Sequence, residues 1–306
     1  MSRRRKGRDI HGILLLDKPA GYSSNQAVQK VRWLYQARKA GHTGSLDPFA
    51  TGMLPICLGE ASKTAGFMLD ASKTYLARAR LGQSTTTGDI EGEVLASEPP
   101  PSLDTAEIAA VLARFEGTIS QIPPMYSALK HQGQPLYRLA RAGQEVPRKA
   151  RQVIVHRLQL VSWESPFLEF RVHCSKGTYV RTLAEDIARA MGSCAHLQAL
   201  RRLAVEPFEE QAMVTLDQLE ARAAEGRADE CLLAPDAGLA EWPVVRLDEI
   251  GAQRFRHGNP VAECGDVGGL VRVYGPGDKL LGLGEVTADG TLKARRLMHL
   301  EALQTR

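Results

Sequence analysis

A twelve-residue segment from Gly41 to Gly52 is the strongest local constraint on what this chain can fold into. It reads Gly-His-Thr-Gly-Ser-Leu-Asp-Pro-Phe-Ala-Thr-Gly, with three glycines and a proline around the carboxylate of Asp47. Glycine is unfavourable inside helices and strands, and proline removes a backbone donor, so the segment cannot form the interior of either. We expect a tight loop that holds Asp47 at a fixed angle, which is where chemistry often lies. Simple turn chemistry of an Asp side chain is the alternative interpretation.

Composition limits the class of protein. The 306 residues are enough for one large domain and a small one, and 43% hydrophobic with 24% charged residues is typical of a soluble globular chain. The longest apolar runs are strand-sized, too short to span a membrane, and no secretory signal is present. The five cysteines lie far apart and lack a CxxC pair, which argues against disulfides and a zinc site. We therefore expect a cytoplasmic protein.

Positive charge is concentrated in two places. Five of the first eight residues are Lys or Arg, and the rest of the chain has 34 basic and 35 acidic residues. Between residues 124 and 157 there are seven basic residues and a single acid, Glu145. Such segments suit a polyanion, because neutralising phosphates releases counterions. For the tail at residues 1–8, a solvated disordered segment is an equally good interpretation.

Periodicity predicts an α+β fold with a mixed sheet. Strands are expected at 12–17, 73–81, 152–162 and 167–174, and the alternation in the second of these points Tyr75 inward. Helices are expected after a Ser24 cap and after two capping boxes, Asp104 with Glu107 and Thr182 with Glu185. They intermix with the strands without strict alternation. From about residue 243, short apolar runs between glycines suggest a small β-barrel.

Five segments, taken in order, resemble the TruB family of tRNA pseudouridine synthases over roughly residues 9–303. They are 12–19, 41–52, 73–75, 123–130 and 176–182, the last followed by 195–197 and 200–202. The resemblance implies a pseudouridine synthase catalytic domain over residues 9–242, with a thumb insertion at 124–151. It also implies a PUA-like RNA-binding domain over residues 243–306, and the basic disordered tail of residues 1–8 precedes both.

The activity implied by this resemblance is isomerisation of uridine 55 in the T loop of tRNA to pseudouridine. The reaction cleaves the bond from ribose C1′ to uracil N1, turns the base and joins C1′ to C5, so it needs no redox cofactor. The resemblance implies a stand-alone bacterial enzyme that binds tRNA as a monomer, with no metal, membrane or protein partner.

Asp47 is the expected catalytic carboxylate, and it can add either to the uracil ring or at C1′. The target base must be flipped out of its loop, and Tyr75 is expected to stack on it and to shuttle the proton lost from C5. Arg181 matches the arginine that pairs with the catalytic aspartate, which would keep the carboxylate ionised. Without the resemblance, Tyr75 reads as a core tyrosine and Arg181 as a surface arginine.

The other expected site residues follow from the same resemblance. Tyr179 is expected against the uracil, Leu200 in the pocket wall, and His42 inserted into the T loop. Lys18 and Lys63 are weaker candidates for phosphate or pocket contacts. The expected phosphate contacts of the thumb are Lys130, Arg141, Arg148 and Arg151.

Two other functions compete with this one. An RNA-binding chaperone that folds tRNA accounts for the thumb and the tail but gives no reason for Asp47, Tyr75 and Arg181. A glycosidase that uses an Asp would release free base or sugar, and it normally needs a second catalytic carboxylate.

Overall fold

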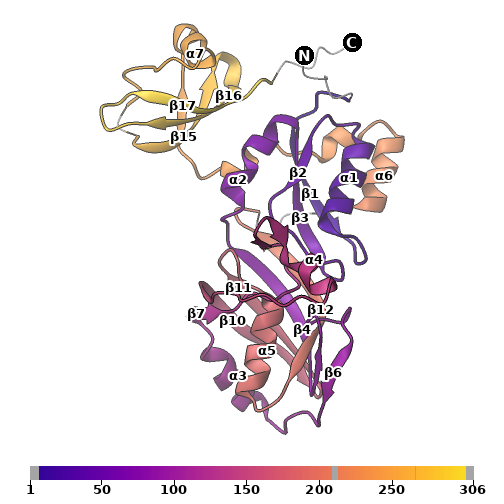
Figure 1. Ribbon diagram of the computed structural model, residues 1–306. Helices are drawn as coiled ribbons and strands as arrows, with labels where there is room; N and C mark the ends of the chain where they lie inside the picture. The colour runs from indigo at the N-terminus through magenta and orange to yellow at the C-terminus, as the bar shows by residue number, and fades with distance from the viewer. Residues whose placement is uncertain (1–6, 209–212, 266, 301–306) are drawn as a thin grey trace.

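One nine-stranded mixed sheet runs through most of the molecule (Figure 1). The computed structural model describes residues 7–208, 213–265 and 267–300. The strand order is β13-β1-β3-β12-β4-β11-β10-β7, with β2 paired to β3; the β1–β13 and β3–β12 pairs are parallel and the others antiparallel. The strands are β1 Gly12–Lys18, β2 Ala40–His42, β3 Thr51–Leu58, β4 Lys73–Leu81, β7 Gly117–Gln121, β10 Arg151–Glu164, β11 Phe167–Cys174, β12 Ala195–Val205 and β13 Val214–Thr215.

The two halves of this sheet are covered differently. In the upper half, α1 (Ser24–Leu34) and α6 (Leu216–Ala224) pack over Leu14 and Leu16, while Met68 of α2 (Ala65–Met68) packs on the opposite face with Ile13 and Leu15. Both faces of β1 are therefore buried, which explains its continuous apolar run.

In the lower half, α3 (Thr105–Ala113) and α5 (Val180–Ala190) cover one face of the sheet. Along β4 the side chains alternate, so that Tyr75 and Ala77 are buried in this core and Arg78 is exposed. The strand and the inward position of Tyr75 agree with the sequence prediction.

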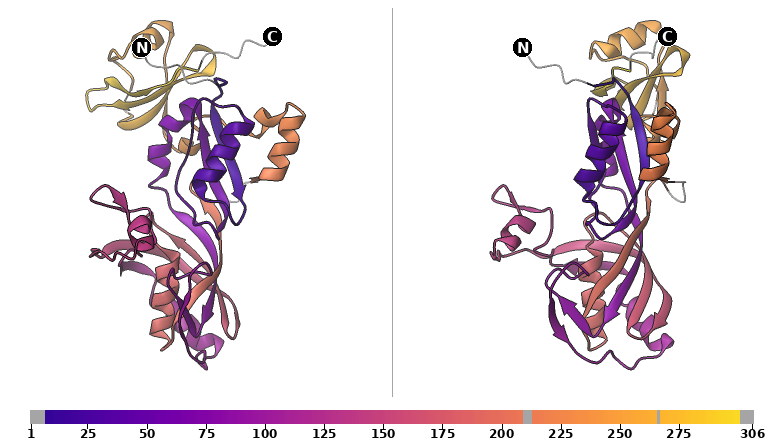
Figure 2. Two further views of the ribbon diagram at one scale, coloured as in Figure 1. Left: turned by 45° about the vertical axis from the view of Figure 1, so that its right-hand side comes forward. Right: turned by 90° about the vertical axis from the view of Figure 1, so that its right-hand side faces the viewer.

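The thumb segment, residues 124–151, leaves the sheet after β7 and returns in β10. Gln121 and Arg151, at its two ends, face each other in the β7–β10 ladder. In Figure 2 the thumb projects from the body as a separate arm. It contains the hairpin of β8 (Lys130–His131) and β9 (Gln134–Pro135), followed by α4 (Leu136–Arg141). A second hairpin, β5 (Gln83–Thr85) with β6 (Val94–Ser97), follows β4.

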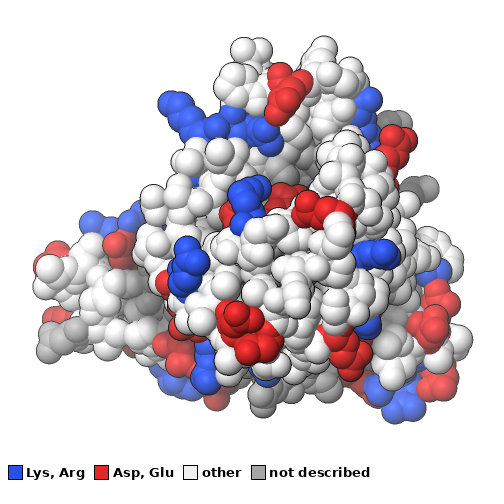
Figure 3. Space-filling model, turned by 90° about the horizontal axis from the view of Figure 1, so that it is seen from below, with Lys and Arg blue, Asp and Glu red and all other residues white. Residues whose placement is uncertain are grey.

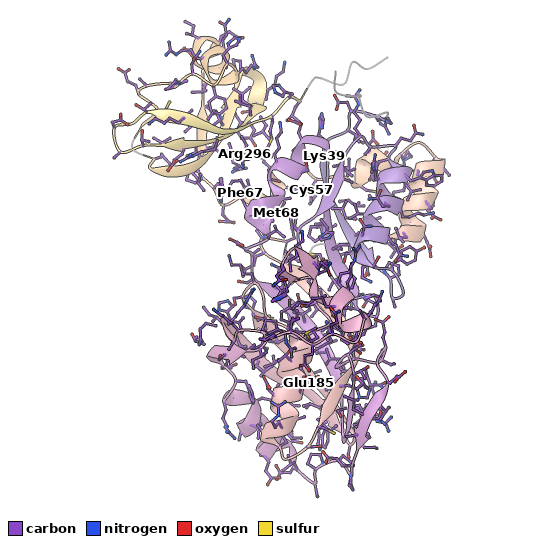
Figure 4. All side chains as sticks on the ribbon, in the orientation of Figure 1. Lys39, Cys57, Phe67, Met68, Glu185 and Arg296 are labelled. Atoms are coloured by element: carbon purple, nitrogen blue, oxygen red, sulfur yellow. The ribbon has the colours of Figure 1, made fainter. Side chains whose placement is uncertain are left out.

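A separate sheet forms the C-terminal part of the chain. Its order is β14-β15-β16-β17, with the helix α7 (Glu249–Arg256) packed on it through Phe255. The strands are β14 Val244–Arg246, β15 Gly269–Gly275, β16 Lys279–Val286 and β17 Leu292–Leu297; 3₁₀ turns lie at Gly59–Lys63, Ala228–Cys231, Ala237–Leu239 and Pro276–Asp278. At the junction with the main body, the Phe67 and Trp242 rings meet edge to face at 4.9 Å. Phe67 and Arg296 mark the two sides of this junction in Figure 4. The domain boundary at residue 243 stays a prediction.

Two expected helix starts are wrong. Ser23, not Ser24, caps α1, and it forms a capping box with Gln26. The Thr182–Glu185 capping box does not form, because α5 already begins at Val180 and its N-cap is Tyr179. The box of Asp104 with Glu107 is confirmed at the start of α3.

On the face seen from below, charge is not gathered in one field (Figure 3). On the underside of the molecule, basic and acidic side chains alternate over the lower lobe (Figure 3). The predicted basic tail lies mostly outside the described residues, and within them Arg8 forms an ion pair with Asp229 at 2.7 Å. In the described part of the chain, no helix is long and apolar enough to cross a membrane.

Candidate active site

The loop between β2 and β3 carries Asp47 and is fixed by polar contacts on both sides of it. Ser24 Oγ accepts from the amide of Leu46 at 2.7 Å and donates to its carbonyl at 3.0 Å. On the other side, Lys18 Nζ donates to the carbonyl of Pro48 at 3.2 Å. The amide of Ala50 closes the turn on the carbonyl of Asp47 at 3.1 Å. Residues 43–50 therefore form an ordered loop, as the sequence predicts. The two ends of the segment correct the prediction, because Gly41 lies within β2 and Gly52 within β3.

Arg181 forms an ion pair with the catalytic candidate. Its Nε lies 3.0 Å from Asp47 Oδ2, and its Nη1 lies 3.3 Å from Asp89 Oδ2. The guanidinium also donates to the carbonyls of Thr87 at 2.6 Å and Tyr126 at 2.7 Å. With its side chain only 4% exposed, Arg181 is held in one orientation by groups from three segments: the Asp47 loop, the turn at Thr87–Asp89 and the start of the thumb.

The Asp47 carboxylate is recessed but still open to the site, since its side chain is 39% exposed. Burial raises the pKa of Asp47 above its ordinary value, and the neighbouring charge of Asp89 adds to this rise. The charges of Arg181 and Lys18 act in the opposite direction on that pKa. The result is a carboxylate less stabilised by solvent than a surface aspartate, facing an open cavity.

A cavity of about 310 Å³ opens in front of Asp47. Tyr75 and Leu200 form part of its wall from β4 and β12, where Leu200 lies opposite Ala77 in the ladder. Tyr179 lines it from the start of α5, where the side chain of Gln121 bonds to both the amide and the carbonyl of Tyr179. The structure thus brings Asp47, Tyr75, Tyr179, Arg181 and Leu200 together around one space.

Burial raises the pKa of the Tyr75 hydroxyl above its ordinary value, so the ring is a neutral phenol at neutral pH. The pKa of Tyr179 is raised for the same reason. Both rings can therefore present an uncharged aromatic face and a hydroxyl donor to a ligand in the cavity.

His42 lies at the end of β2, half-buried, five residues before Asp47. Its Nδ1 accepts from the amide of Gly44 at 3.2 Å, which leaves Nε2 to carry the proton of the neutral ring. Burial, with the nearby charge of Arg202, lowers the pKa of His42, so a neutral imidazole is favoured.

Two lysines are placed differently from what the sequence suggested. Lys18 is fully buried, and its Nζ donates to the carbonyls of Pro19, Tyr22 and Pro48. Lys18 therefore supports the Asp47 loop from the protein interior, and this buried placement does not fit a direct phosphate contact. Lys63 bonds to Glu60 and to the carbonyl of Leu297, and it does not line the cavity. Lys63 joins the main body to the C-terminal sheet instead.

The basic side chains of the thumb stand in two settings. Lys130, Arg141 and Arg151 are exposed, whereas Arg148 donates to Glu145 and to the carbonyl of Pro123. Between the thumb and α5 lies a larger hollow of about 710 Å³, lined partly by Glu185, which Figure 4 labels. None of the residues grouped around Asp47 lines that hollow, so we do not assign the chemistry to it.

Three residues at the candidate site were not predicted from the sequence. Asp89 is buried and orients Arg181, but in the sequence it resembles an ordinary turn aspartate after a threonine run. Lys73, buried in the cavity wall, has its pKa lowered to about 8 by burial. Arg202, which lines the same cavity, is the largest fully buried side chain of the described residues. The sequence signal that was available for Arg202 was its place in the Leu200-Arg201-Arg202 segment.

Three models of known protein families match this sequence. The family model "TruB family pseudouridylate synthase (N terminal domain)" matches residues 32–180. "tRNA pseudouridylate synthase B C-terminal domain" matches residues 181–240, and "Pseudouridine synthase II TruB, C-terminal" matches 243–298.

Among similar proteins are two named tRNA pseudouridine synthase B. The one from Pseudomonas fluorescens (strain Pf0-1) is 50% identical over 298 residues, covering 96% of this chain and 97% of that protein. The one from Nitrosococcus oceani is 52% identical over 299 residues and covers 97% of each. Among solved structures, a chain of a Cbf5-Nop10-Gar1 complex matches with a TM-score of 0.70 and 25% identity, covering 94% of this chain and 84% of that one.

Proposed function

The chain belongs to the TruB family of pseudouridine synthases, and we propose that it isomerises uridine 55 in the T loop of tRNA to pseudouridine. Relatives about 50% identical over nearly the whole chain carry the name tRNA pseudouridine synthase B. The family, the isomerase class and the α+β fold with a large mixed sheet and a C-terminal domain, all predicted from the sequence, are confirmed.

One observation carries the catalytic assignment: Asp47 lines a cavity of about 310 Å³, and its carboxylate is paired there with Arg181. This volume is at the small end of the range for small-molecule sites, so it suits one extruded nucleotide rather than a base-paired stem. Asp47 is the only carboxylate among the described residues that line the cavity. That favours an isomerase over a glycosidase, which normally needs two.

The proposed steps use the residues around this cavity. The flipped uracil stacks on Tyr75, and Asp47 attacks either the ring or C1′. Cleavage of the C1′–N1 bond frees the base to turn, C1′ then bonds to C5, and the bond to Asp47 is broken so that its carboxylate is regenerated. The proton on C5 leaves and N1 gains one, so nothing is oxidised or reduced. The Tyr75 hydroxyl, near the base in this arrangement, is the proposed relay for the C5 proton.

RNA binding in this proposal uses surfaces around the cavity. Lys130, Arg141 and Arg151 of the thumb are exposed and suit phosphate contacts that position the RNA. Neutral His42, beside the Asp47 loop, suits stacking in the T loop. We also propose that the enzyme works in the cytoplasm as a monomer without a protein partner.

Replacement of Asp47 by Asn tests the proposal. Unmodified tRNA labelled with tritium at uridine C5 should release tritium to water with the wild-type protein, and the Asp47→Asn variant should bind tRNA without releasing any. Equal improvement of tRNA folding by both proteins, with no tritium released by either, would favour the chaperone. Release of free base or ribose would favour the glycosidase.

A further inference from the structure

Arg202 on β12 contacts the Asp47 loop through three separate backbone carbonyls. Its Nε donates to Met53 at 2.6 Å, its Nη2 to Gly44 at 3.1 Å and its Nη1 to Ser45 at 3.4 Å. Only 1% of the residue is exposed. Gly44 and Ser45 precede the catalytic carboxylate and Met53 follows it, so one guanidinium ties the two limbs of the loop together.

The backbone of Arg202 holds the same loop at its far end. Arg202 lies opposite Gly52 in the short parallel ladder between β12 and β3. A Cβ on Gly52 would overlap the Arg202 carbonyl oxygen and come within 2.9 Å of its backbone nitrogen. The two strands therefore approach closely at this rung, and the side chain of Arg202 spans from there across the loop.

The charge of this guanidinium is not neutralised by an ion pair. Among the described residues, no carboxylate lies within ion-pair distance of Arg202, in contrast to Arg201, which pairs with Asp17 at 2.7 Å. An unpaired buried charge is costly unless its hydrogen bonds are made, and here each guanidinium nitrogen has a carbonyl acceptor. The positive charge therefore remains beside the cavity, where it lowers the pKa of His42 and opposes the rise in the pKa of Tyr75.

We propose that Arg202 is a positioning residue for the isomerisation: by bridging the carbonyls of Gly44, Ser45 and Met53, it fixes the Asp47 carboxylate at its working distance from the flipped nucleotide. The inference rests on the proposed function. Lysine cannot replace this role fully, because an ammonium is a point donor and cannot span three acceptors as a planar fork does.

The test compares Arg202→Met and Arg202→Lys with Arg201→Met under single-turnover conditions on unmodified tRNA. Displacing a reacting group by about 1 Å costs on the order of 100-fold in rate, which is the loss expected for Arg202→Met. Arg202→Lys should lose roughly 10-fold, because it keeps the charge but not the fork. The Kd for tRNA should stay within about 3-fold of wild type in both, because the phosphate contacts are elsewhere. Arg201→Met, the matched control, removes a partly exposed pair and should change the rate by less than about 3-fold.

Hydrogen exchange distinguishes a local loosening of the Asp47 loop from a general loss of stability. Protection should fall at the amides of residues 44–47, 49 and 50 in the Arg202 variants and remain unchanged in α3 and α7. A wild-type rate in Arg202→Lys with normal protection of the loop would overturn the proposal, and so would a loss confined to tRNA affinity. If the wild-type protein itself formed no pseudouridine, the proposed function would fail instead.

Discussion

Substitution of Gly52 by alanine should disable the enzyme, because one added methyl group would displace the whole Asp47 loop. Gly52 has φ +99°, which side-chain-bearing residues rarely adopt, and its missing Cβ is where the Arg202 carbonyl lies. The backbone strain alone costs about 1–3 kcal/mol. Relief of the overlap requires the strands to separate by about 1 Å, which stretches the ladder and moves the Asp47 loop. We expect destabilisation of about 3 kcal/mol or more and a fall in kcat on the order of 100-fold.

Gly226 provides the matched control. It has φ +74° after α6, and nothing lies within 4 Å of a Cβ built there. Gly226→Ala should therefore show only the strain, about 1 kcal/mol, with kcat unchanged. Urea unfolding gives the free energy of unfolding for each variant, and tritium release gives kcat. If Gly52→Ala matched Gly226→Ala in both measurements, close strand approach would not be what fixes the loop.

Three further predictions follow from the site and its surroundings. Burial lowers the pKa of Lys18 from 10.5 to about 8, so the folded chain releases this proton first, and the stability contributed by Lys18 should rise with pH between these values. Because the pKa of Lys73 is also lowered to about 8, urea unfolding of Lys18→Met at pH 7.5, 9 and 10 should show a smaller rise than the wild type, and an equal rise would contradict the prediction. Lys63→Met should lower the free energy of unfolding by no more than about 1 kcal/mol and leave kcat on an isolated T stem-loop unchanged. A large loss of kcat would instead support the sequence prediction that Lys63 contacts the substrate in the pocket. Deletion of residues 1–8 should make the slope of log K against log salt for tRNA less negative, and an unchanged slope would exclude phosphate contacts by the tail.

The elements that sequence predicts well are those whose pattern is set locally. Tyr75 could be placed on a strand with its ring inward because the second half of β4 alternates between buried alanines and arginines, and Asp47 could be placed in a loop because Gly44 and Pro48 lie on either side of it. The residues of the candidate active site were predicted from a resemblance rather than from physics. Their grouping around one cavity is seen only in three dimensions.

The predictions that failed depended on distant partners. The α5 helix starts at Val180 because Gln121 of β7 fixes the backbone of Tyr179, and nothing near Thr182 in the sequence reveals this. The central strand β12 was missed because it carries two consecutive arginines. One of them is buried against the Asp47 loop and the other pairs with Asp17, so polar residues occupy a buried strand at a cost that only tertiary contacts offset.

The way the thumb joins the sheet has a consequence for its evolution. Because the segment leaves and returns at one rung, Gln121 opposite Arg151, its length can change without shifting the register of either strand. The register of the sheet therefore places no constraint on insertions in the outer part of the arm, around the β8–β9 hairpin. The limit is Tyr126, whose carbonyl accepts from Arg181. Trimming the arm beyond this residue would remove Ser127 and Ala128 from the cavity wall and the proposed phosphate contacts of Lys130 and Arg141, and a cut that removes Tyr126 reaches the ion pair of Asp47 and Arg181 itself.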